Sequence, residues 1–330
     1  MKYEKNIVLL SGFLLFMTLI NAQDGFELQG EYVGFLDNRE YFNKHNRAQT
    51  MFGNRFDAKL QIKIDSTQNV YVGLDYIHEF GAAANTISLF PVIYYSYRNR
   101  NMDFQFDSFP RYKNLDYPHL ILTDTLDYYR PNIEGALFNL KSKIAHQNIW
   151  IDWTGRQSET VNESFLAGTS GKLHTGIFFI ENYLYMYHHA AKLTVDSSFH
   201  LRDNGGGMLL AGIDLRKRYF VRLALGGAFS YDRYRPADYQ INKGIFAEIL
   251  LQYGLYGLRM THYHGEGLSL AYGDGFFSAG DYTRMDGEIN FFHKKSYQFH
   301  LQLSLHFLEG DINTSQKLIL RIKLPDTRLK

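Results

Sequence analysis

The sequence predicts an all-β protein, a closed antiparallel transmembrane β-barrel of about 16 strands, with about 12 to 14 strands as the alternatives. Three observations lead to this fold class. Many segments alternate apolar and polar residues with a period of two, short and long connections alternate between them, and an export leader precedes them. The mean hydropathy is mildly negative. It does not exclude a membrane location, because alternating strands average out in hydropathy.

The N-terminus has the features of a secretory signal peptide over residues 1–22. Lys2 and Lys5 give a basic start, an apolar run extends from Ile7 to Ile20, and Ala22 offers a small residue for cleavage. This run is shorter than the roughly 20 residues that a membrane-spanning helix needs. We therefore expect export, removal of residues 1–22, and a single domain over 23–330. The absence of cysteine excludes disulfides, thiolate metal sites and a lipid-modified N-terminal cysteine.

The clearest alternation lies in residues 297–307, which predict a strand with one apolar and one polar face. One parity holds Tyr297, Phe299, Leu301, Leu303, Leu305 and Phe307, and the other holds Gln298, His300, Gln302, Ser304 and His306. Segments 285–291 and 318–324 repeat the pattern with charged residues on the polar face. A soluble sandwich could show the same parity with its apolar face turned inward.

The connections distinguish the two folds. We predict strands near 26–36, 52–64, 70–80, 87–98, 101–109, 133–143, 146–155, 161–170, 172–189, 207–215, 219–233, 244–253, 256–264, 282–291, 297–308 and 316–324. Short connections are predicted near 65–69, 99–100, 144–145, 171, 216–218, 254–255 and 292–296. Longer ones are predicted at 37–51, 81–86, 110–132, 156–160, 190–206, 234–243, 265–281 and 309–315. Tight turns at one end and long loops at the other are typical of transmembrane barrels.

This pattern resembles Gram-negative outer-membrane β-barrels, and sixteen-stranded porins in particular, over the whole mature chain and without a specific motif. The resemblance implies an outer-membrane location, with membrane lipid and the outer-membrane insertion machinery as partners. The polar tail Pro325–Lys330 departs from barrels that end on an aromatic residue. The resemblance also implies that the third long connection, 110–132, enters the barrel, where its charged residues Arg111, Lys113, Asp116, Asp124 and Asp127 could pair with the wall. The alternative is an ordered external lid.

In a barrel, the charged parity faces the lumen and sets selectivity. The lumen candidates are Arg55, Asp57, Lys59, Lys63, Asp75, Arg222, Arg284, Asp286, Glu288, Arg321 and Lys323. The function expected from this reading is a porin-like channel or transporter for small polar solutes. The alternative is a barrel enzyme or a surface glycan-binding protein that uses the long loops. The net charge of +1 gives no basic field, so nucleic acid is not expected as a partner.

The stretch 149–170 contains both tryptophans and four charged residues around a loop: Asp152, Arg156, Glu159 and Glu163. Carboxylates beside an arginine could bind a sugar or perform acid–base chemistry. They could also form an ion-pair network that pins a loop to the wall, which is the interpretation we favour. No spacing singles out a Ser–His pair, so no catalytic residue is assigned. His262 and His264 share a strand face but lack a third ligand, so neither a metal nor a cofactor is expected.

Overall fold

The computed structural model describes residues 25–82, 88–112, 114–193, 201–216, 219–293 and 296–328. The predicted signal peptide, 1–22, and Lys113 lie outside the described residues. Within these ranges, no helix has the length and apolar character needed to cross a bilayer.

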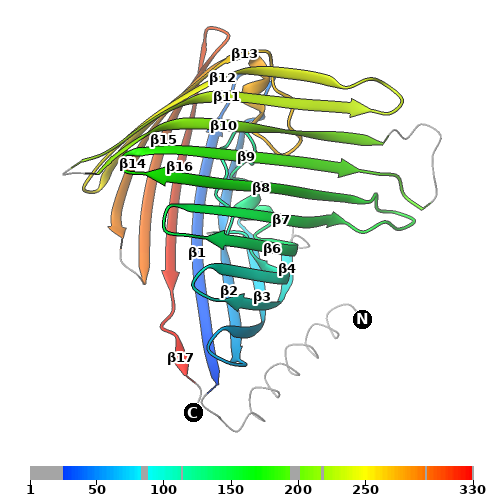
Figure 1. Cartoon of the computed structure of the whole chain (residues 1–330), viewed down its shortest axis with the longest axis vertical. Helices are drawn as coiled ribbons and strands as arrows, with labels where there is room; N and C mark the ends of the chain where they lie inside the picture. Colours follow the sequence, from blue (N-terminus) through cyan, green and yellow to red (C-terminus); the bar gives the residue numbers. More distant parts are fainter. Residues whose placement is uncertain are drawn as a thin grey trace.

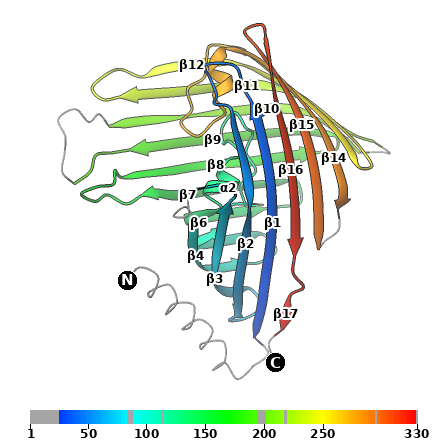
Figure 2. The same ribbon diagram turned by 180° about the vertical axis from the view of Figure 1, so that it is seen from behind.

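Sixteen long strands form one closed antiparallel wall, as the sequence predicts (Figures 1 and 2). Each strand pairs with its neighbours in chain order, and β1 pairs with β16 to close the barrel. A short β17, Thr327–Arg328, adds to the start of β1. The strands are β1 Phe26–Glu40, β2 Gln49–Lys63, β3 Gln68–Glu79, β4 Ser88–Arg98, β5 Met102–Pro110, β6 Asn132–Lys141, β7 Ala145–Gly155, β8 Ser164–Thr175, β9 Phe178–His189, β10 Arg202–Arg216, β11 Phe220–Tyr234, β12 Gln240–Tyr253, β13 Tyr256–Gly265, β14 Asp281–His293, β15 Tyr297–Leu308 and β16 Asp311–Lys323.

The apolar parity of the strands faces outward and the polar parity faces the lumen. In β15, Leu303 is 54% exposed, whereas its neighbour Gln302 is 8% exposed. A soluble sandwich would bury the leucine. The outward apolar band is the arrangement that a bilayer solvates, and the charged interior is that of a lumen.

Two connections differ from the prediction. The turn expected at 171 lies instead at Gly176 and Ile177, where Gly176 adopts the left-handed φ of +60°. Gly171 is part of β8, and an added Cβ there would meet the Gln147 side chain of the neighbouring strand. The connection expected at 309–315 is a tight turn at Glu309 and Gly310, both with positive φ. These left-handed residues suit a hairpin turn, so β16 begins at Asp311.

Two loops fold into the barrel and fill its middle. Residues 111–131, here called loop 3, carry the helix α2, Leu126–Tyr129, and residues 266–280, here called loop 7, carry the 3₁₀-helix η1, Gly275–Ala279. The loops bond to each other, from Thr123 N to Tyr272 O at 2.7 Å and from Asp274 N to His119 O at 2.9 Å. The predicted entry of 110–132 is therefore confirmed, and the external-lid alternative is wrong.

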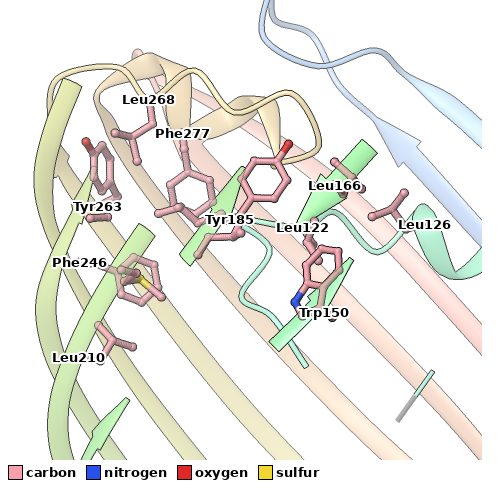
Figure 3. Close-up of a cluster of buried hydrophobic side chains, with 14 of the residues drawn as sticks. Leu122, Leu126, Trp150, Leu166, Tyr185, Leu210, Phe246, Tyr263, Leu268 and Phe277 are labelled. Atoms are coloured by element: carbon pink, nitrogen blue, oxygen red, sulfur yellow. The ribbon is translucent and has the colours of Figure 1, made fainter. Parts of the chain in front are cut away.

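An apolar cluster anchors these loops to the inner wall. Leu120 and Ile121 of loop 3 are at most 1% exposed, and Phe276 and Phe277 of loop 7 at most 4%. They pack with inward-facing residues of the wall such as Trp150, and Figure 3 shows Leu122, Phe277 and Phe246 within this cluster. The burial of these side chains holds both loops across the lumen.

Candidate functional site

Loops 3 and 7 together form a plug in the lumen. Asp124 of loop 3 joins this plug to the barrel wall where β1 pairs with β16. Its Oδ1 accepts a hydrogen bond from Arg39 Nη2 of β1 at 2.9 Å, and its Oδ2 pairs with Lys317 Nζ of β16. Arg39 also forms a two-point pair with Asp37, with Nε–Oδ1 at 3.0 Å and Nη2–Oδ2 at 2.7 Å. The closure of β1 on β16 places Asn38 opposite Gln316 and Asp37 opposite Lys317. The pairing of β1 with β16 therefore brings together Arg39 and Lys317, the two basic residues that bind Asp124.

Three cavities surround the plug, and Asp124 borders all of them. The lower cavity, of about 940 Å³, lies between loop 3 and strands β4 to β15 toward the short-turn end. The side cavity, of about 310 Å³, lies between α2 and the wall strands β1, β2 and β14 to β16. The upper cavity, also of about 310 Å³, lies under the loop that joins β1 to β2. The point of contact between loop 3 and the wall thus separates the two ends of the lumen.

The upper cavity has a polar lining with an excess of cations. Its charged lining residues are Arg39, Arg47, Arg284 and Lys317 against Asp37, Asp124 and Asp274, with hydroxyls and amides between them. Arg284 bonds to Asp286 at 2.7 Å and approaches Asp274 at 4.0 Å. Arg47 is exposed, and within the described part of the chain it forms no ion pair. A cation without a carboxylate partner at the cavity's rim can attract an anionic group.

Burial shapes the charges inside loop 3. Burial, together with the nearby cations Arg284 and Lys317, holds the pKa of His119 well below its ordinary value, so this imidazole is neutral at pH 7. Burial also raises the pKa of Asp127, although Arg111 and Arg321 oppose this shift. The loop therefore presents Asp124 as its anionic contact with the Arg39–Lys317 pair.

The predicted lumen candidates lie on the lumen-facing parity of their strands, and most of them pair with one another or with neighbours. Four ion pairs are Arg55–Asp75 at 2.7 Å, Lys59–Asp57 at 2.8 Å, Arg321–Glu31 at 2.7 Å and Lys63–Glu27 at 2.8 Å. Arg222 bridges Glu181 and Glu248, and Arg284 pairs with Asp286. Glu288 lines the lower cavity, and Lys323 is exposed near the end of β16. Sequence reasoning named the lumen charges but missed Arg39, whose place at a strand end carries no pattern signal.

Asp152 pins the root of loop 3, and the other three charged residues of its stretch do not gather around it. Asp152 is fully buried, pairs with Arg111, lies 3.7 Å from Arg130, and accepts a bond from Glu134 N at 3.0 Å. Arg156 and Glu159 are exposed in the loop after β7, and Glu163 is half-buried beside β8. The geometry at Asp152 matches the loop-pinning interpretation.

A hydrogen-bonded chain of three side chains, missed by the sequence analysis, lines the wall beside the upper cavity. Tyr282 of β14 lies with its hydroxyl 2.6 Å from His306 Nδ1, and His306 Nε2 lies 3.2 Å from Ser315 Oγ of β16. His306 is 1% exposed and stacks on Phe276, whereas Ser315 borders the upper cavity. A serine in contact with an oriented histidine is an arrangement that can support nucleophilic chemistry. The sequence could have indicated this chain, because all three residues lie on the polar, lumen-facing parity of three successive strands.

The comparisons with known proteins add a family and a fold. A family model described as lipid A 3'-O-deacylase-type matches residues 20–325. The chain belongs to this family. No curated protein matches it at a significant level.

Solved barrels share the architecture at low identity. OccK2 (OpdF) of Pseudomonas aeruginosa aligns with a TM-score of 0.57 and 9% identity, covering 93% of this chain and 100% of that one. An anion-selective porin from Comamonas acidovorans gives 0.56 and 8%, covering 90% and 100%. OmpF of Salmonella typhi, in complex with daunomycin, gives 0.51 and 11%, covering 91% and 98%. These likenesses show a porin-like fold.

Proposed function

We propose that the protein is an outer-membrane channel for small polar solutes, with a preference for anionic ones at the long-loop end. One observation carries the proposal: the three cavities of the lumen meet at the contact of Asp124 with Arg39 and Lys317. A movement of this one contact would join them into a passage. The excess of cations around the upper cavity supports the preference for anions, as does Arg47 at its rim, which forms no ion pair with any described residue.

The porin-like fold and the strand parity support an outer-membrane location, and one of the aligned structures is named an anion-selective porin. The lumen-facing ion pairs named above would determine the electrostatic potential along the rest of the passage. Loop 3 is held by apolar packing, by Asp152 at its root and by Asp124 at the closure of the wall, so its position controls the width of the passage.

The test is single-channel conductance of the purified protein in a planar bilayer, with a KCl gradient to read selectivity. Asp124→Asn should raise the conductance and the anion selectivity, because loop 3 loses both ion pairs and the wall cations are freed. Asp116→Asn, the same change in the same loop at an exposed residue that lines the lower cavity, is the control. It should have little effect.

Deleting residues 115–128 should raise the conductance further while the barrel remains folded, because the wall ladder does not include loop 3. A small conductance that stays unchanged after a clean deletion would contradict the constriction. Silence of both the intact and the deleted protein would contradict the channel.

A second candidate is ester hydrolysis, favoured by the Ser315–His306 contact together with membership of the lipid A 3'-O-deacylase-type family. Ser315 Oγ would attack the ester carbonyl while His306 Nε2 takes its proton, and the ester C–O bond would then break as His306 returns this proton to the leaving alcohol. Water, activated by His306, would release the acyl group from the serine as a carboxylic acid. Arg39 and Lys317, which border the same cavity, could stabilise the oxyanion.

This candidate is tested by release of a 3'-O-linked acyl chain from lipid A and by hydrolysis of a soluble p-nitrophenyl ester. Ser315→Ala should abolish both, and Ser304→Ala, opposite it on β15, should not. Equal activity of the two variants would remove Ser315 from the reaction.

A further inference from the structure

The barrel is closed, but its ladder between β4 and β5 is short where loop 3 leaves the wall. The ladder between β4 and β5 runs only from Arg98–Asp103 to Tyr94–Asp107. Above this point, residues 88–93 of β4 pair with β3 alone, and residues 108–110 of β5 pair with β6 alone. We call the unpaired boundary between these two segments the β4–β5 seam.

The seam exists because β5 turns inward. Asp107 has φ +92°, which breaks the alternation of the strand, so that the next residues, Ser108 and Phe109, are both buried. Such a left-handed residue other than glycine is uncommon and marks a local change of direction. Pro91, on the β4 side, has no N–H to donate, so it removes one ladder donor from this edge.

The end of β5 and the start of β6, where loop 3 begins and ends, form the tip of the β5–β6 hairpin. More interactions hold this tip to β7 than to β4. Toward β7, the tip is held by the buried Asp152 with Arg111, and by Arg130 Nη1, which donates to Thr154 O at 3.4 Å. Toward β4, the described residues show one hydrogen bond between the two edges of the seam, from Ser108 Oγ to Pro91 O at 3.0 Å, and one that reaches past β4, from Asn132 Nδ2 to Asp75 Oδ2 of β3 at 3.4 Å. Parting the wall at the seam therefore breaks far less hydrogen bonding than parting it at a complete ladder.

Apolar side chains line the seam on both faces. Leu89, Ile93 and Phe106 point outward and are 49%, 46% and 55% exposed. Val92 and Phe109 point inward and are 0% exposed, as members of the apolar cluster around loop 3. Apolar side chains thus follow one another across the seam, from the lipid-facing surface to the cluster around loop 3, whereas charged residues line much of the lumen. An acyl chain that crosses the seam stays in contact with apolar side chains, which is favourable, whereas a polar solute finds no hydrogen-bonding partner among them.

We propose that the β4–β5 seam is a lateral entrance through which an acyl chain of a bilayer lipid reaches the apolar cluster beside loop 3. This goes beyond the channel proposed above and does not depend on it. The chain enters between the outward-facing Leu89 and Ile93 and the tip of the β5–β6 hairpin. It then packs against Phe109 and Val92.

The test places the photoreactive residue p-benzoyl-phenylalanine at single positions of the full barrel in phosphatidylcholine vesicles. After illumination, covalent phospholipid adducts are measured by mass spectrometry. Phe109 is the test position. Phe246, also in the cluster but within ladders of β12 to both β11 and β13, is the matched control. Phe106, which faces lipid, is the positive control.

The Phe109 position should give adducts several-fold above those at Phe246, and closer to those at Phe106. If the Phe109 variant fails to fold into the barrel, Val92 supplies the same test from the other side of the seam. Adduct yields at Phe109 and Val92 that do not exceed the yield at Phe246 would overturn the proposal.

Discussion

Leu303→Arg tests the assignment of the lipid-facing side at its most sensitive place. Leu303 lies in the middle of β15 and is 54% exposed, with its side chain on the outward parity. An arginine on the lipid face of a barrel costs about 2–4 kcal/mol at the bilayer midplane. Since 1.4 kcal/mol is tenfold in an equilibrium constant, the folded-to-unfolded ratio should fall by roughly 30- to 700-fold.

The matched control must face the lumen and have space for the longer side chain. Gln302 is the sequence neighbour, but it is 8% exposed and its Nε2 donates to Asp286 Oδ1 at 3.0 Å. Asn290 of β14 is half-buried and borders the side cavity of about 310 Å³, so Asn290→Arg has room and should cost much less than the lipid-facing change. Urea unfolding in phospholipid vesicles, followed by the shift between folded and unfolded bands on a gel, measures both. Equal costs for Leu303→Arg and Asn290→Arg would refute the assignment of the faces.

Two further changes follow from the ion pairs and the turns. Asp152→Asn leaves the buried guanidinium of Arg111 without its partner and should cost about 3–5 kcal/mol in the same unfolding assay, whereas the exposed Arg156→Gln should stay within about 0.5 kcal/mol. In the turn after β2, hydrogen bonds from the backbone and hydroxyl of Thr67 lower the pKa of Asp65 to about 2 from 3.8. A depressed carboxyl pKa stabilises the fold above the unfolded value, and this contribution is lost as the pH falls from about 4 to about 2. Asp65→Asn should therefore flatten the acid dependence of stability in that window, and an unchanged slope would contradict the role of this turn.

Several features of the protein follow from the sequence because they depend only on local order. The period of two in residues 297–307 assigns each side chain of β15 to one face, since neighbouring side chains on a strand point to opposite sides. The same parity places Arg55, Asp57 and Asp75 in the lumen, where the structure pairs them. The entry of 110–132 into the barrel was implied by the resemblance to porins, with an external lid as the alternative, and the structure decides for entry. The apolar run of this connection at Leu120 is what the cluster buries.

Other features needed the tertiary structure, because they join residues that are far apart in the chain. Closure of β1 on β16 brings Arg39 beside Lys317, and only the inward fold of loop 3 sets Asp124 between them. The turn at Gly176 was missed because a glycine with φ +60° and one crowded by a neighbouring strand, such as Gly171, look alike in sequence. The contact of His306 with Ser315 depends on the register of the last hairpin. Local patterns determine which way a side chain faces, but registers and ring closure decide which side chains meet, because those depend on the packing of the whole wall.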